Sequence, residues 1–106
     1  TLARMAHRVL TLRCFDGPQG RLSLSVQEMH GEILSIPQPL TTLRRSAVGR
    51  PQLVSHDAYD EHANLIWIRF NEALQSGDVP VCEGRFGARM RVGSVADGPF
   101  QFTLQE

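Results

Sequence analysis

The chain has 106 residues, of which 42% are hydrophobic and 21% charged, and its formal net charge is zero. This length corresponds to one domain, and the composition is typical of a globular protein rather than a disordered or fibrous one. Electrical neutrality excludes a general nucleic-acid binder but leaves room for a local basic patch. No apolar run approaches the roughly 20 residues needed to span a bilayer. We therefore expect residues 1–106 to form a single domain located in the cytoplasm.

The first predicted element is an amphipathic helix near the start of the chain. Leu2, Met5, Ala6, Val9 and Leu10 recur at the spacing of one apolar helix face. Residues 16–20 follow as a strong turn signal.

Two strands are predicted next. Residues 22–26 alternate between apolar side chains and serine, which is typical of a half-buried strand. Residues 33–36 form a short apolar strand that Pro37 and Pro39 end, because proline cannot donate to a ladder. A strand that stops in this way leaves polar groups at the end of a sheet, where ligand sites commonly form.

The central part of the chain is predicted to be an irregular loop over residues 41–55, followed by a second helix from about Asp57 to Ser76. The apolar stripe of this helix is Tyr59, Ala63, Ile66, Trp67, Phe70 and Leu74, and Gly77 occupies the position of a C-cap glycine.

The last third of the chain contains further strand patterns. One begins at Val79, another covers residues 88–92, and a third covers residues 100–104 after the turn at residues 97–99. The sequence thus predicts an α+β domain with two amphipathic helices and five or six strands in a mostly antiparallel sheet.

The basic residues have an unusual composition. All eleven are arginine, and Arg44, Arg45 and Arg50 lie in a stretch, residues 33–56, that has no acidic residue. A GC-rich genome explains the absence of lysine. The functional alternative is phosphate recognition, because the guanidinium group matches phosphate geometry.

No metal site is predicted. Cys14 and Cys82 lack a CxxC partner and are interpreted as small buried thiols, and the four histidines show no ligand spacing. There is no GxSxG, HExxH or phosphate-binding glycine loop, so no local motif identifies an enzyme.

Several segments together carry a resemblance to a known family. Near the C-terminus, Gly-Arg-Phe-Gly-Ala-x-Met-x-Val spans residues 84–92, and Asp-Gly-Pro at residues 97–99 precedes a terminal apolar strand. Upstream, residues 8–15 read Arg-Val-Leu-x-x-x-x-Phe with Arg13 between, and residues 22–26 read Leu-Ser-Leu-Ser-Val. In this order the segments resemble the D-aminoacyl-tRNA deacylases, also called D-tyrosyl-tRNA deacylases, over essentially the whole chain. The resemblance implies that family's fold.

The resemblance also implies a function. Family members hydrolyse the ester that joins a D-amino acid, or in some branches glycine or misattached L-alanine, to the 3′ end of tRNA. They act as homodimers without metal or cofactor, and neither a membrane nor DNA is an expected partner. On this basis Gln38, the amide of Leu40 and the hydroxyl of Thr41 are the expected catalytic elements. The expected substrate-binding residues are Pro37, Pro39, Phe86, Met90, Gly98 and Pro99, and the expected contacts to tRNA phosphates are Arg44, Arg45 and Arg50.

The sequence departs from the family at two places. Residues 37–41 read Pro-Gln-Pro-Leu-Thr where the family has Ser-Gln-Phe-Thr-Leu, so Leu40 takes the place of the family threonine and Pro39 offers no N–H donor. The family's N-terminal strands have no counterpart before Thr1. These departures keep an alternative open: a non-catalytic descendant that binds RNA ends or a protein partner. A structural domain unrelated to tRNA is the third possibility.

Overall fold

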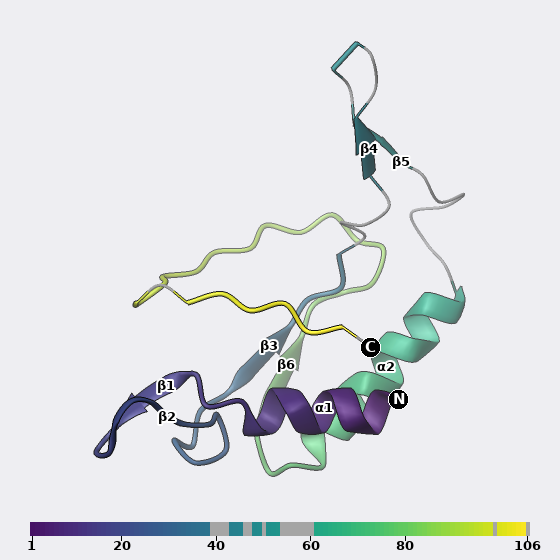
Figure 1. The fold of residues 1–106 in the computed structure, drawn as a ribbon. Helices are drawn as coiled ribbons and strands as arrows, with labels where there is room; N and C mark the ends of the chain where they lie inside the picture. The colour runs from purple at the N-terminus through teal and green to yellow at the C-terminus, as the bar shows by residue number, and fades with distance from the viewer. Residues whose placement is uncertain (39–42, 46–47, 50, 54–60, 99, 106) are drawn as a thin grey trace.

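The computed structural model describes residues 1–38, 43–45, 48–49, 51–53, 61–98 and 100–105. Two helices and six short strands occur in these ranges (Figure 1). The predicted α+β class is confirmed. No helix in the described ranges is long and apolar enough to cross a membrane. In chain order the elements are α1 (Leu2–Thr11), β1 (Phe15–Gly17), β2 (Gly20–Leu24), β3 (Ile33–Ser35), β4 (Leu43–Arg45), β5 (Pro51–Leu53), α2 (Glu61–Gln75) and β6 (Val81–Glu83).

Helix α1 forms where the apolar spacing predicts it. The hydroxyl of Thr1 caps its first turn by accepting from the amide of Arg4 at 3.4 Å. Arg8, in the last turn, carries a positive charge at the end of the helix dipole that favours it. Ala6 and Leu10 are buried, so the predicted stripe faces the core.

Helix α2 packs its C-terminal half against α1. Leu74 is 1% exposed and joins Ala6 and Leu10 in the core, which confirms one end of the predicted stripe. Ile66 is 40% exposed, so the prediction that it faces the core is wrong. The predicted helix start, residues 57–60, lies outside the described residues. The buried core consists of Ala6, Leu10, Val26, Leu74 and Val79.

The end of α2 differs from the prediction in one respect. The residue with left-handed backbone is Asp78, with φ 59°, and not Gly77, which was expected to be the C-cap glycine. The amide of Gly77 nevertheless closes the helix by donating to the carbonyl of Leu74 at 3.1 Å.

Strands β1 and β2 form an antiparallel hairpin with an irregular register between Phe15 and Gly17. The turn residue Gly20 has φ 121°, a conformation that favours glycine. Leu22 is also left-handed, with φ 53°, and its amide donates to a carboxylate oxygen of Asp16 at 3.1 Å. This bond holds a strained residue in place at the exposed end of the hairpin.

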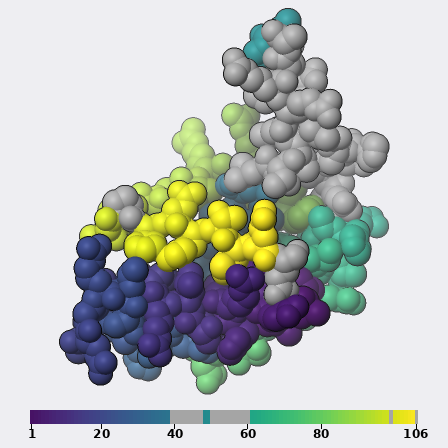
Figure 2. Space-filling model, viewed as in Figure 1, coloured from purple at the N-terminus to yellow at the C-terminus, as the bar shows by residue number. Residues whose placement is uncertain are grey.

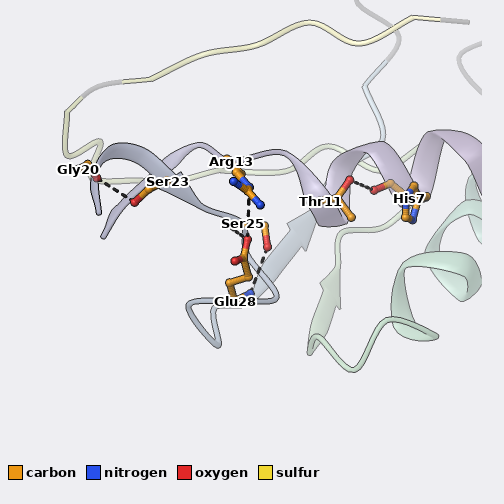
Figure 3. A network of polar contacts seen from close by, with 7 residues as sticks. All are labelled: His7, Thr11, Arg13, Gly20, Ser23, Ser25 and Glu28. Carbon is orange, nitrogen blue, oxygen red and sulfur yellow. Dashed lines mark hydrogen bonds and ion pairs between the residues drawn. The ribbon is translucent and has the colours of Figure 1, made fainter. Parts of the chain in front are cut away.

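A turn after β2 is held by two reciprocal hydrogen bonds, drawn in Figure 3. The amide of Ser25 donates to Oε1 of Glu28 at 3.1 Å, and the amide of Glu28 donates to Oγ of Ser25 at 3.2 Å. Hydrogen bonds to the carboxylate from the backbone amide and the side chain of Ser25, together with the nearby charge of Arg13, hold the pKa of the Glu28 carboxyl below its usual 4.5. The Arg13–Glu28 ion pair itself, at 3.8 Å, is exposed to water and contributes little.

The pairing of β3 and β6 is parallel, with Ile33, Leu34 and Ser35 opposite Val81, Cys82 and Glu83. The two hairpins, β1–β2 and β4–β5, are antiparallel as expected. Parallel strands need a long crossover connection, and here α2 lies within it. Sequence periodicity does not reveal this direction, because it reports on the faces of a strand and not on its partner.

Strands β4 and β5 lie within the segment predicted to be an irregular loop, so that prediction is wrong for these residues. Arg44 pairs with Gln52 and Arg45 with Pro51. In Figure 1 this hairpin projects away from the two helices.

The segments predicted as strands at residues 88–92 and 100–104 contain no strand. Both lack a ladder partner in the described part of the chain, and without one an alternating pattern cannot produce a sheet. Val95 is 98% exposed, and Phe100 and Phe102 stack on each other with ring centroids 4.5 Å apart. Figure 2 shows the C-terminal segment, in yellow, lying along α1, where Arg8 donates to the carbonyl of Gln105 at 3.2 Å.

The two cysteines are not buried as predicted. Cys14 is half-buried and Cys82 is exposed. Cys82 lies opposite Leu34 in the β3–β6 register, and Leu34 is 59% exposed. Both residues therefore lie on the sheet face that α2 leaves uncovered.

Candidate functional site

The candidate site lies where the parallel strands β3 and β6 end. Because the carboxyl ends of parallel strands meet at one edge, the segment after β3 and the segment after β6 leave the sheet together. The amide of Gly84 donates to the carbonyl of Ser35 at 2.7 Å and continues the pairing one residue beyond β6. Pro37, from the first segment, thereby lies near Gly84, at the start of the second segment, which contains the predicted Phe86.

Gly84 marks the closest approach of the two segments. A Cβ atom at this position would lie 3.0 Å from Sδ of Met90 and 3.3 Å from Cδ of Pro37. The sulfur of Met90 also accepts from the amide of Arg85 at 3.4 Å. Two predicted substrate-binding residues, Pro37 and Met90, therefore both lie beside Gly84, where an added Cβ would be in tight contact with each of them.

A small cavity of about 180 Å³ opens beside Gly84. Its lining includes Ile36, Gly84 and Met90, with the guanidinium-bearing Arg91 also among the lining residues. An apolar wall with a cationic neighbour suits a small ligand that has both an apolar and an anionic part.

A buried polar network lies on the α2 side of β3. The indole N–H of Trp67 donates to Oγ of Ser35 at 2.9 Å, and the Ser35 hydroxyl donates to Oδ1 of Asn71 at 2.6 Å. Asn71 is 1% exposed, and its Nδ2 has no hydrogen-bond partner within the described residues. An unpaired buried donor of this kind costs about 1–3 kcal/mol.

The sequence pattern predicts Trp67 only as part of the apolar stripe of the helix and gives no role to Asn71. The network is therefore not predicted from the sequence. One signal was present: Asn71 follows Trp67 by four residues, so the two share a helix face, and a polar residue there interrupts an apolar pattern.

Phe86 packs on the same helix. Its ring centroid lies 6.2 Å from that of Trp67, with the planes tilted by 40°. This distance is within the range of a favourable aromatic pair. The segment after β6 thus packs on α2 through Phe86, and its Met90 lies beside Gly84.

Gly98 lies elsewhere. It lines a larger cavity of about 310 Å³, together with Phe15, Asp16, Arg21, Leu22 and Phe100. The two cavities share no lining residue, so within one chain the structure does not bring Gly98 to Pro37 and Met90. The candidate site is therefore assigned to the end of β3, where the predicted segments converge, and not to the larger cavity.

The remaining predicted site residues have the following places. Gln38 is exposed at the end of the β3 segment. Arg44 and Arg45 are residues of strand β4. Pro39, Leu40, Thr41, Arg50 and Pro99 lie outside the described residues.

The described part of the chain contains no group of three or more His, Cys, Asp or Glu side chains that could hold a metal ion. Among the described residues, the one carboxyl group with a clearly lowered pKa, that of Glu28, belongs to the turn after β2 and not to the strand end at Pro37.

Comparisons with known proteins agree with the resemblance noted in the sequence. Residues 1–105 match the protein family described as D-Tyr-tRNA(Tyr) deacylase. The D-aminoacyl-tRNA deacylase of Bifidobacterium longum subsp. infantis is 51% identical over 103 residues, which are 97% of this chain and 63% of that protein. The enzyme of the same name from an Exiguobacterium species is 35% identical over 102 residues, covering 96% of this chain and 69% of the relative.

A solved structure is also similar. The chain named c-Myc DNA Unwinding Element Binding Protein superposes with a TM-score of 0.70 at 32% identity, covering 93% of this chain and 67% of that one. The present chain spans 63% of the length of the bifidobacterial relatives. With a family match over nearly every residue and a similar fold, this chain belongs to the D-Tyr-tRNA(Tyr) deacylase family.

Proposed function

We propose that the protein takes part in tRNA editing by hydrolysing the ester between an amino acid and the 3′ end of tRNA. The substrate class is D-aminoacyl-tRNA, with glycyl-tRNA and misacylated L-alanyl-tRNA as the further candidates. The observation that carries the proposal is the placement of Pro37 and Met90 beside Gly84, at the end of two parallel strands, in a chain that belongs to this family.

The chemistry requires donors directed at the oxyanion that develops when the ester is attacked. Gln38 is exposed next to Pro37, so its side-chain amide is available to a substrate. The amide of Leu40 and the hydroxyl of Thr41 complete the proposed set. The apolar cavity beside Met90 is suited to the amino-acid side chain or the terminal base.

A homodimer forms part of the proposal. Gly98 lies at a cavity separate from the one beside Gly84, so the Gly98–Pro99 turn acts on a site only if that site belongs to a second copy. In the dimer, this turn would reject side chains of the wrong chirality. A cytoplasmic location follows from the substrate.

Arg44, Arg45 and Arg50 are the proposed contacts to tRNA phosphates. Two of them, Arg44 and Arg45, lie on the projecting β4–β5 hairpin, and we propose that this hairpin contacts the body of a tRNA beyond the site. Phosphate contacts of this kind fix orientation without reading sequence.

A second candidate function is binding without hydrolysis. The sequence at residues 37–41 favours it, because Pro39 has no N–H and Leu40 replaces the family threonine. The name of the similar solved structure also describes a binding protein. The partner would be an RNA end or a protein.

Deacylation of D-tyrosyl-, glycyl- and L-alanyl-tRNA by the purified chain distinguishes the two. An editing enzyme hydrolyses at least one of them above the uncatalysed rate. Gln38→Ala lowers that rate, whereas Gln19→Ala, an exposed glutamine in the β1–β2 turn, leaves it unchanged. Gly98→Ala/Pro99→Ala removes the discrimination between D- and L-substrates.

If none of the three substrates is hydrolysed by folded, dimeric protein, the binding function replaces the enzymatic one. Retention of uncharged tRNA on the same sample then identifies RNA as the partner.

A further inference from the structure

Ser35 connects helix α2 to both segments that border the candidate site. Its hydroxyl is bonded to Trp67 and Asn71, at 2.9 and 2.6 Å. Its carbonyl accepts from the amide of Gly84 at 2.7 Å, at the start of the segment after β6. Pro37 follows two residues later in the chain. One residue therefore joins the helix, the end of β3 and the end of β6.

The chemistry of the three side chains determines the direction of the network. An indole N–H can only donate, so Oγ of Ser35 must accept from Trp67. The Ser35 proton is then available for Asn71, which must present its Oδ1 to receive it. Nδ2 of Asn71 consequently faces away from Ser35, buried and without a partner among the described residues.

This arrangement is unfavourable for stability alone. A buried donor without an acceptor destabilises the folded state. A leucine at position 71 would suit the helix better and would bring no unpaired donor into the core. Local arrangements that lower stability are expected where function requires a fixed geometry.

We propose that Ser35, Trp67 and Asn71 are positioning residues for the deacylation. Trp67 holds Phe86 through the ring contact at 6.2 Å, and Ser35 holds Gly84 and the start of the Pro37–Gln38 segment. Asn71 fixes the orientation of the Ser35 hydroxyl. The network sets the distance between the segment after β3 and the segment after β6, which border the site. It acts on the substrate only through these two segments. This inference rests on the proposed function for its kinetic test.

The first test compares Ser35→Val with Ser35→Thr, because valine and threonine have the same shape and differ only in the hydroxyl. We expect Ser35→Val to lower kcat by about 10- to 100-fold relative to Ser35→Thr, as displacements near 1 Å do, with a smaller change in KM. Equal rates for the two variants, with both proteins folded, overturn the proposal.

The second test separates positioning from structural support. We expect Asn71→Leu to raise Tm and to lower kcat. A higher Tm with an unchanged kcat shows that the network has no role in the reaction. A lower Tm shows that Asn71 supports the fold. Either result overturns the proposal.

A third measurement does not depend on activity. In ¹H–¹⁵N spectra, Ser35→Val is expected to shift the amide resonances of Gln38, Gly84 and Phe86 more than Ser35→Thr does. Trp67 is the one tryptophan of the chain, so its fluorescence reports the loss of its acceptor directly. If the unmodified chain hydrolyses none of the aminoacyl-tRNAs, the proposed function fails, and these spectra still decide the positioning role. Unshifted resonances in Ser35→Val overturn it.

Discussion

Gly77 and Leu10 approach so closely that no side chain fits between them: a Cβ on Gly77 would lie 2.6 Å from Cδ1 of Leu10. Gln27 encloses the same position, and its Nε2 donates to the carbonyl of Gly77 at 3.0 Å. The glycine thus allows the turn after α2 to pack directly on α1.

The first prediction follows from this contact. Gly77→Ala should destabilise the protein by about 1–3 kcal/mol, because Leu10 is in the core and cannot move without a change in its rotamer. Urea unfolding measures the difference. Gly93→Ala is the matched control, because a Cβ there meets nothing within 4 Å, and it should be neutral or slightly stabilising. Equal stability of the two variants would contradict the packing argument.

The second prediction concerns acid stability. Glu28 has a lowered pKa in the folded state, so its charge contributes stability above the ordinary value of 4.5. That contribution is lost as the pH falls from 4.5 through the lowered folded value. Glu28→Gln should therefore be less stable than the unmodified chain at about pH 7, and the gap should narrow as the pH falls below 4.5. Unfolding curves across this range test it, and a gap independent of pH would show that the carboxylate charge is not involved.

The third prediction concerns tRNA binding. Arg44→Ala/Arg45→Ala should weaken tRNA binding and reduce the slope of log affinity against log salt by about 1.5–2, since each phosphate contact releases about one counterion. Filter binding over a salt series measures the slope. Arg13→Ala/Arg21→Ala removes the same charge from exposed positions outside the β4–β5 hairpin and should leave the slope nearly unchanged. Similar slopes for both double variants would reject a specific role for the hairpin.

The fourth prediction concerns the strand end. Gly84→Ala places a methyl group 3.0 Å from the sulfur of Met90 and 3.3 Å from Cδ of Pro37, so one or both of these side chains must shift by a few tenths of an ångström. We expect kcat/KM for hydrolysis of the aminoacyl-tRNA substrate to fall by about 10- to 100-fold. Gln19→Ala, in the exposed β1–β2 turn and outside this segment, serves as the control. Unchanged kcat/KM in a folded Gly84→Ala protein would mean that this contact is not part of the site.

The sequence predicted the elements whose signal is local. The spacing of Ala6 and Leu10 identified helix α1, and the Gly-Arg-Phe-Gly-Ala segment with the Asp-Gly-Pro turn identified the family. Pro37 and Met90 were also predicted as site residues, and both lie beside Gly84, but their role in the site stays a prediction.

The features that the sequence did not predict depend on contacts between distant residues. No pattern in the sequence of either strand indicates the parallel pairing of Ile33 with Val81. The role of Gly77 was assigned to helix capping, because its neighbour Leu10 is remote in the chain. Ser35, Trp67 and Asn71 form their network only once α2 lies against β3, so each residue by itself appears ordinary.

The parallel pairing of β3 with β6 also bears on how the protein folds. Residue 33 meets residue 81, so the ladder closes a loop that contains the β4–β5 hairpin and all of α2. Closing such a loop loses chain entropy before its contacts are gained, which makes this pairing a late and slow event. The segments that border the candidate site come together only beyond that ladder. The amide hydrogen of Gly84 should therefore exchange with solvent only on global unfolding. A nascent chain cannot form the site until residue 84 has emerged.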